Sequence, residues 1–362
     1  MPSDISTQAE KKLLNISSAY YLKQFDFEEE ILRSFVASGY SSIEHVRGCY
    51  IMFDLSRSYW YELGTLLWFI SLLHKLRKQG NDIQLVLPEP EDSKSENLLN
   101  FLTRWRFFET LKECVDDPVN LLKPNQLWYT KKEGRYKLAV AQDEYGSETI
   151  LHNNRLLEIT TILSGKHEFH DDSPLSRFLN MYYHEVIISA LSKLCGWDAS
   201  ITKKFFQHVI TEGLRNSIEH SEGNFSNISM RLDKKNLTLA IADNGIGIPT
   251  VLRNAFKESS THKDLLQSSD ADLIKFFTEP KLVLELRDSR LINLSVQKGI
   301  TSKRGRKGFG LYYLKSFVLS QGGELRIRSG KACVDFANER EEPRDNMMES
   351  PGTMLRIQTP LK

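Results

Sequence analysis

The sequence has no long apolar run. A membrane-spanning helix needs about 20 consecutive apolar residues, whereas the richest stretch here, Leu63 to Leu73, is short and is followed by His74 and Lys75. The first residues, MPSDISTQAEKK, also do not show the basic segment and apolar core of a secretory signal. We therefore expect a cytoplasmic protein that does not associate with a membrane.

Cysteine is scarce, and so is any excess of one charge. The four cysteines, Cys49, Cys114, Cys195 and Cys333, are far apart and form no CxxC pair. This spacing excludes a disulfide framework and a zinc site, and it fits a reducing compartment. The sequence has 48 basic and 47 acidic side chains, a net charge of +1, so nucleic acid is not indicated as a partner.

The remaining composition is that of a globular protein. Hydrophobic residues make up 40% and charged residues 26% of the 362 positions, which excludes overall disorder. This length predicts two domains of about 150 residues each. We expect a polar leader over residues 1–24, a first domain over 25–125, a connecting segment over 126–174 and a second domain over 175–362.

The first domain shows the pattern of a βαβ unit. Residues 48–55 (GCYIMFDL) and 83–87 (IQLVL) are predicted strands, and residues 64–78 between them are a predicted helix that Gly80 closes. Strands joined by such a helix are parallel. A further helix is predicted over residues 98–112.

This part of the chain resembles the STAS domain, the fold of bacterial anti-sigma-factor antagonists. The resemblance covers about residues 45–112 and rests on the strand ending Phe53-Asp54-Leu55-Ser56, on Gly64 and on the sequence IQLVLP. STAS domains that are switched by phosphorylation carry Asp-Ser-Ser just before that glycine. Tyr61, Glu62 and Leu63 stand there instead, so the resemblance implies a STAS-like docking module that has no phosphorylation switch.

In the second half, two short strands are predicted over 126–130 and 136–141, and a helical hairpin over 175–194 and 201–221. Asp198 or Ser200 can cap the second helix. That helix carries an apolar ridge and a polar ridge. These consist of Phe206, Ile210, Leu214 and Ile218, and of His208, Glu212, Asn216 and His220. Alone, the polar ridge describes any helix with a solvated face. The charged run 338–348 is predicted as a surface loop.

Two glycine-containing segments follow this helix. A predicted strand over 237–242 runs into Asp243-Asn244-Gly245-Ile246-Gly247-Ile248-Pro249, which places a carboxylate beside a turn that a ligand can approach closely. An ordinary Asn-Gly turn is the alternative. The segment GRKGFGL, residues 305–311, opens a predicted helix over 312–321. Free N–H groups at such a helix start suit a phosphate. Neither a Rossmann fold nor a P-loop is supported, because no strand precedes this segment and no GK[ST] follows.

In this order the segments resemble the GHKL ATPase superfamily, which includes DNA gyrase B, histidine kinases and anti-sigma-factor kinases. The matching elements are Glu212-x-x-x-Asn216, Asp243-x-Gly245-x-Gly247-Ile248, Gly308-Phe309-Gly310-Leu311 and a last strand over 353–358 entered through Gly352-Thr353. The resemblance covers about residues 175–362. It implies an α/β (α+β) protein in which a STAS-like domain is followed by a GHKL (Bergerat) sandwich, with helices on one face of a mixed sheet.

The resemblance also implies roles for single residues. Asp243 would accept a hydrogen bond from the adenine amino group, Asn216 would bind Mg²⁺, and Glu212 would be the catalytic base that activates water. Residues 249–304 would form a lid over ATP. The implied ATP-binding residues are Asn216, Asp243, Gly245, Gly247, Ile248, Lys303, Lys307, Gly308, Phe309, Gly310, Leu311 and Thr353.

We therefore expect an ATP-binding regulatory protein that hydrolyses Mg·ATP slowly, with lid ordering as a switch for dimerisation or for binding a protein partner. The alternatives are an anti-sigma-type serine protein kinase, a histidine kinase that uses His184 before Glu185, and an interaction module that binds nucleotide without hydrolysis. A zinc protease is excluded, because Ile188 stands where HExxH requires histidine.

Overall fold

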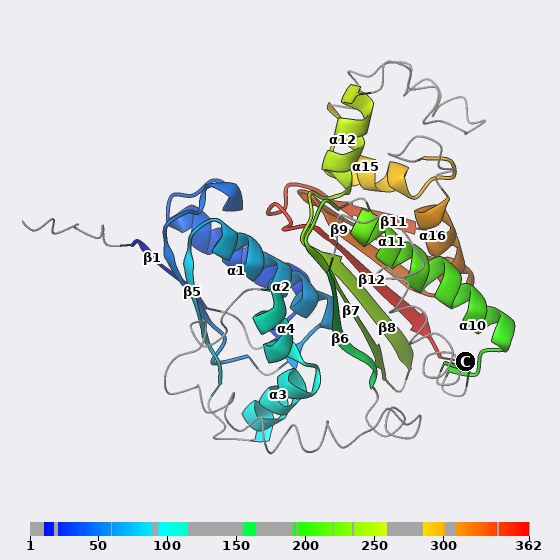
Figure 1. The fold of residues 1–362 in the computed structure, drawn as a ribbon, viewed down its shortest axis with the longest axis horizontal. Coiled ribbons are helices and arrows are strands. Elements are labelled where there is room, and N and C mark those ends of the chain that lie inside the picture. The colour runs from blue at the N-terminus through cyan, green and yellow to red at the C-terminus, as the bar shows by residue number, and fades with distance from the viewer. Residues whose placement is uncertain are drawn as a thin grey trace, which may run out of the picture.

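The apolar stretch at residues 63–73 lies at the centre of the fold. The structure, a computed structural model, describes residues 11–17, 21–58, 60–88, 93–114, 155–163, 191–192, 195–219, 221–233, 235–258, 285–300, 309–338 and 340–361. Within these ranges the chain forms a small sheet, a layer of helices, a large sheet and a second layer of helices (Figure 1).

The small sheet is parallel and consists of β1 (Leu13–Ser17), β3 (Tyr50–Asp54) and β5 (Asp82–Val86), in the order β1-β3-β5. The parallel pairing of β3 with β5 confirms the predicted βαβ unit. The predicted polar leader is wrong in part, because β1 lies within residues 1–24 and pairs with β3. The alternation of buried and exposed side chains in β1 covers only five residues: Leu14 and Ile16 are buried, whereas Leu13 is exposed. A separate short pair is formed by β2 (Tyr21–Leu22) and β4 (Trp60–Tyr61).

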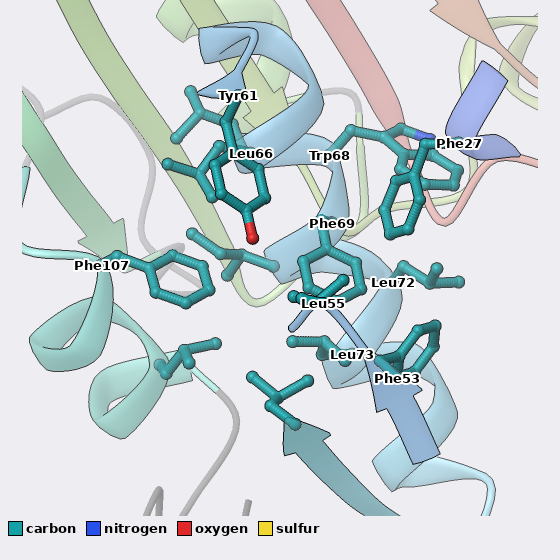
Figure 2. Packing of buried hydrophobic residues seen from close by; sticks show 14 of the residues in the cluster. Phe27, Phe53, Leu55, Tyr61, Leu66, Trp68, Phe69, Leu72, Leu73 and Phe107 are labelled. Atoms are coloured by element: carbon teal, nitrogen blue, oxygen red, sulfur yellow. The ribbon is translucent and has the colours of Figure 1, made fainter. Parts of the chain in front are cut away.

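Helix α2 (Leu63–Lys78) lies between the two sheets (Figure 1). Twelve of its 16 residues are buried, as expected for a helix that has apolar neighbours on all sides. Phe69 of α2 contacts Phe53 of β3 and Phe27 of helix α1 (Gln24–Ala37), with ring centroids 5.1 Å apart in both pairs (Figure 2). No helix in the described ranges is both long enough and apolar enough to cross a bilayer.

The helix predicted over residues 98–112 is two helices. Helix α3 (Ser93–Arg104) ends before Trp105, and α4 (Phe107–Cys114) begins after Arg106. Arg106 has a φ of 58°, a left-handed conformation that interrupts a right-handed helix. The break lets Trp105, Phe107 and Phe108 all become buried in the same core. A 3₁₀ turn, η1 (Ile43–His45), precedes β3.

The large sheet has seven strands in the order β11-β10-β9-β12-β8-β7-β6. In sequence order they are β6 (Arg155–Leu163), β7 (Phe225–Leu232), β8 (Asn236–Asp243), β9 (Glu324–Ser329), β10 (Ala332–Ala337), β11 (Arg340–Arg344) and β12 (Thr353–Pro360). Every pairing is antiparallel. The expected mixed sheet is therefore wrong, because hairpins join neighbouring strands and β12 runs opposite to both β8 and β9.

Only β8 and β12 of this sheet were predicted; β6, β7, β9, β10 and β11 lie where no strand was predicted. Strand β6 falls in the predicted connecting segment, and the strands predicted over 126–130 and 136–141 lie outside the described residues. Strand β11 falls in the predicted surface loop 338–348, and all five of its residues are exposed. Among the described strands it is an edge strand, and it contains Pro343, which is tolerated at an edge because only one side of the strand pairs with another described strand.

Most helices of the second half cover one face of the large sheet, whereas the helix over residues 248–258 extends beyond the end of the sheet (Figure 1). The helices of this half are α10 (Ala199–Phe205), a π-helical segment η5 (Phe206–Thr211), α11 (Glu212–Glu219), α12 (Ile248–Glu258), α15 (Asp288–Ser295) and α16 (Gly310–Ser320). Helix α2 covers the other face. On β8, Leu239 and Ile241 belong to the core below α11, whereas Ala240 and Ala242 belong to the core around α2. The small alanine side chains let α2 approach the sheet closely.

Candidate functional site

A cavity of about 410 Å³ lies between the helices of the second half and the ends of strands β8 and β12. Residues from five separate stretches of the sequence line it. The lining residues are His208, Glu212, Arg215, Asn216, Ser217, Ser221, Asp243, Gly247, Ile248, Val251, Leu252, Ser295, Ile300, Phe309, Gly310, Leu311, Tyr313, Thr353 and Leu355.

One wall of the cavity is the helix that runs from α10 through the π-helical segment into α11. Its start is capped by Asp198, whose carboxylate accepts a hydrogen bond of 2.7 Å from the Ile201 N–H. The apolar ridge packs toward the sheet, with Phe206, Ile210 and Leu214 buried. The π-helical segment widens the turn before Glu212, a feature that often accompanies functional sites.

The polar ridge faces the cavity as far as it is described. His208, Glu212 and Asn216 all line the cavity, while His220 lies outside the described residues. Glu212 Oε1 accepts a hydrogen bond of 2.5 Å from Arg215 Nη1. The amide nitrogen of Asn216 is buried and has no hydrogen-bond partner in the described part of the chain. A bound ligand could satisfy this group.

The first residue of α16 closes against this wall. A Cβ atom at Gly310 would lie 2.6 Å from Glu212 Oε2 and 3.5 Å from the Asn216 side-chain nitrogen. A side chain at position 310 would therefore fit only if the Glu212 carboxylate moved from this place. The first turn of a helix has N–H groups that make no bond within the helix, and Gly310 and Leu311 of this turn line the cavity, which favours a negatively charged ligand.

Asp243, at the end of β8, lines another part of the cavity. It is only 3% exposed, and its Oδ1 accepts hydrogen bonds from the backbone N–H groups of Gly245 at 2.9 Å and Thr353 at 3.1 Å. Burial raises the pKa of this carboxyl to about 7, although the two hydrogen bonds act in the opposite direction. The group is therefore poised between its neutral and charged forms near neutral pH.

Glycines hold the backbone close around Asp243. A Cβ at Gly245 would lie 1.9 Å from the Ser221 carbonyl oxygen, and one at Gly352 would lie 2.2 Å from the Asp243 carbonyl oxygen. Gly247 has a φ of 80°, which favours glycine. Gly245 is not part of the cavity wall; it lies behind the wall and lets the turn pack against Ser221.

Ser329 at the end of β9 connects the two loops beside Asp243. Its Oγ accepts a hydrogen bond of 2.9 Å from the Ile248 N–H and lies 2.9 Å from Thr353 Oγ1. The sequence pattern does not single out this serine. The only signal in the sequence is its place before Gly330, which many unrelated serines share.

The predicted site residues thus fall into three groups. Those that line the cavity are Glu212, Asn216, Asp243, Gly247, Ile248, Phe309, Gly310, Leu311 and Thr353. Gly245 supports the cavity from behind, and Lys303, Lys307 and Gly308 lie outside the described residues. Arg215 and the ring pair His208–Tyr313, with centroids 5.4 Å apart, line the cavity without having been predicted.

The cavity wall can also be tested for its fit to Mg²⁺. Within the described ranges no group of three histidine, cysteine or acidic side chains is arranged to hold a metal ion. Mg²⁺ that arrives with a nucleotide needs only one or two protein ligands, because phosphates and water supply the others. Asn216 lines the cavity and its amide oxygen is a ligand of the type that Mg²⁺ takes, whereas its unsatisfied amide nitrogen is a donor that would suit a phosphate or water oxygen.

Comparison with known proteins matches the part of the chain that carries this cavity. Residues 202–362 match the family described as histidine kinase-, DNA gyrase B-, and HSP90-like ATPase. A solved structure of a mycobacterial sensor histidine kinase, MprB, is similar at 20% identity and a TM-score of 0.24, over 45% of this chain and 72% of that one. No curated protein sequence matches the chain. Residues 202–362 therefore carry an ATPase-type domain of the GHKL group.

Proposed function

We propose that the chain binds Mg·ATP in this cavity and hydrolyses it slowly, as a regulatory switch. The lining of the cavity carries the proposal. The buried carboxylate of Asp243 is on one part of the wall, and Glu212 and Asn216 are on another part, beside Gly310 at the start of α16. This arrangement suits a ligand that has a base at one end and phosphates at the other.

At the proposed adenine end, Asp243 accepts a hydrogen bond from the exocyclic amino group. Thr353 and Gly247 support this contact, because the Thr353 N–H fixes Asp243 Oδ1 and the backbone of Gly247 packs closely against Ser329. The apolar side chains Ile248, Leu252 and Leu355 line the same space. They would pack against the faces of the ring.

At the proposed phosphate end, Glu212 orients the attacking water and accepts its proton. Arg215 holds Oε1, and Oε2 points toward the start of α16. The N–H groups at Gly310 face the phosphates. The amide oxygen of Asn216 would hold Mg²⁺, which supplies positive charge to the phosphate oxygens when it is bound.

Transfer of the phosphate to a protein is the second candidate. An acceptor in the STAS-like module proposed for the N-terminal part is disfavoured by Tyr61 and Leu63, which are only 3% exposed. Between them Glu62 forms an ion pair with Arg356 at 2.7 Å. These positions are therefore buried against the large sheet and offer no accessible hydroxyl. His184 lies outside the described residues, and phosphorylation there stays an alternative.

One experiment separates these functions. Pure protein is incubated with Mg²⁺ and ATP labelled at the γ-phosphate, and the label is followed over time. Slow release as free phosphate is expected. Label on the protein would favour a kinase, and label that stays on bound ATP would favour a module that does not hydrolyse nucleotide.

Substitution of Asp243 by asparagine tests the adenine end. The amide presents a donor where the amino group of adenine needs an acceptor, and we expect ATP binding to weaken by about 2–3 kcal/mol. GTP should compete poorly even with the wild type, because its carbonyl at that position cannot donate. Titration calorimetry measures both effects, and equal affinity for ATP and GTP would contradict the assignment.

The pKa of Asp243 predicts a pH dependence of binding. The carboxyl is neutral below pH 7 and charged above it, and the charged form is the stronger acceptor. We expect the affinity for adenosine, which has no titrating phosphate, to fall about tenfold from pH 8 to pH 6. In the Asp243→Asn variant the affinity should be weak and independent of pH. A wild-type affinity that is constant over this range would refute the prediction.

The proposed lid, residues 249–304, contains α12 and α15 among the described residues. Helix α12 starts at Ile248 beside Asp243, while Ile300 lies on the cavity wall. A nucleotide would therefore contact both ends of this segment. We expect the segment to resist limited proteolysis when a non-hydrolysable ATP analogue is bound, and to be cut faster with ADP. Oligomeric state or partner binding should change in parallel. Identical cleavage in both states would contradict a switch.

A further inference from the structure

An ion pair connects the N-terminal helix α1 with the large sheet. Glu28 in α1 is 2% exposed and Arg328 in β9 is fully buried. The guanidinium donates to both carboxylate oxygens of Glu28. Its Nε lies 3.2 Å from Oε1 and 2.9 Å from Oε2, and its Nη2 lies 2.7 Å from Oε2. Three hundred residues of sequence separate the two partners. No sequence pattern indicates such a pair.

Arg328 also holds the backbone around it. Its Nη1 donates to the carbonyl oxygens of Gly330 at 2.5 Å and Ala332 at 3.2 Å, and its Nη2 donates to the carbonyl of Met348. A buried pair of similar-sized apolar side chains would often be as stable as such an ion pair. Apolar side chains could not fix these carbonyl oxygens in place, so the guanidinium contributes orientation that packing alone would not.

The carbonyls held by Arg328 belong to the loops that build the adenine end of the cavity. The Gly330 carbonyl accepts a hydrogen bond of 2.8 Å from the Ser350 N–H. Two residues beyond Ser350, Gly352 lies against Asp243 and is followed by Thr353, whose N–H bonds Asp243. The residue after Arg328 is Ser329, which faces the other side of the sheet and contacts Ile248 and Thr353.

A second set of contacts joins the N-terminal layer to the same loops. The indole Nε1 of Trp68 donates to Ser350 Oγ at 3.2 Å, and Glu62 forms an ion pair with Arg356 in β12 at 2.7 Å. A Cβ at Gly64 would lie 3.2 Å from the sulfur of Met354. Helix α1 thus contacts β9, and helix α2 contacts β12, whose first residue, Thr353, bonds to Asp243.

We propose that Glu28 and Arg328 are positioning residues for the adenine end of the cavity. The packing of helices α1 and α2, the N-terminal layer, on the large sheet would then set the affinity for nucleotide. The proposal rests on the proposed function, since it takes adenosine nucleotides as the ligand. Because coupling between two sites is reciprocal, a bound nucleotide must also stabilise the docking of α1 on the sheet.

Two variants test the proposal. Glu28→Gln keeps the shape and removes the charge, and the double variant Glu28→Leu with Arg328→Met removes both charges. We expect the dissociation constant for adenosine to rise tenfold or more, and the KM for ATP to rise while kcat changes less than threefold. Leu85→Ala is the control, because Leu85 is buried in β5, where it pairs with Phe53 of β3 in the small sheet. Its dissociation constant should stay within twofold of the wild-type value.

A measurement on the wild type keeps the test independent of whether the variants fold. Hydrogen exchange of α1, residues 24–37, should slow when adenosine binds. Unchanged affinity in folded variants, or unchanged exchange in α1 while adenosine binds, overturns the coupling and leaves the proposed function intact. Absence of adenosine and ATP binding by the wild type overturns both. An equal loss of affinity in Leu85→Ala would also overturn the coupling, because the loss would then result from lower stability of the fold and not from the position of Glu28 and Arg328.

Discussion

ATP hydrolysis is expected to fall by about 10²-fold or more when Glu212 is replaced by glutamine. Glutamine keeps the shape of the side chain and can still accept from Arg215, but it cannot take a proton from water. The proposed adenine contact at Asp243 is untouched, so the affinity for ATP should remain within a fewfold of the wild-type value. Phosphate release and titration calorimetry on the same preparation measure the two quantities.

Glu219→Gln is the matched control for this prediction. Glu219 is on the same helix and its Oε1 lies 4.0 Å from the same Arg215, but it does not line the cavity. Its substitution should change hydrolysis less than threefold. If Glu212→Gln retained wild-type turnover, or if both variants lost activity equally, Glu212 would not be the base.

The second large effect is expected on stability, from Trp68→Ala. Trp68 is 1% exposed in α2 and belongs to the same core cluster as Phe27 (Figure 2). Removing such a side chain from a core should lower the free energy of unfolding by about 3–5 kcal/mol. Because the core around α2 includes residues of both sheets, the loss should appear in one unfolding transition that contains both halves of the chain.

Trp68→Phe separates packing from the hydrogen bond to Ser350. Phenylalanine keeps most of the apolar contact and loses the indole donor, so the cost of the lost hydrogen bond should be about 1 kcal/mol. Denaturant titration followed by circular dichroism measures both variants. Two separate transitions in the wild type, with only the first shifted by Trp68→Ala, would contradict a shared core.

The site could be predicted from the sequence because its parts are local. Asp243 and Gly247 lie in one turn, and Glu212 and Asn216 lie one helical turn apart. Residues that must act together over such a short range stand at a fixed spacing, which can be recognised in the sequence. The roles assigned to these residues stay predictions until the variants are measured.

Long-range partners could not be predicted in this way. The pairing of Glu28 with Arg328 depends on how α1 meets the large sheet, and neither residue belongs to a local pattern. Strand β1 has too few residues for its alternation to stand out from a polar segment. The apolar character of α2 indicates burial, but it does not show that a second sheet supplies the covering surface.

The position of β12 has a consequence for how the protein is made. This strand follows all the others of its sheet in sequence, yet it lies between β8 and β9 near the middle of the sheet. During synthesis the ribosome therefore releases α2 and six strands before the strand that joins them is available. Until then, the apolar side of α2 and the unpaired edges of β8 and β9 remain open to contact with other chains. Production of this protein should accordingly be sensitive to the translation rate and to chaperones that shield nascent chains.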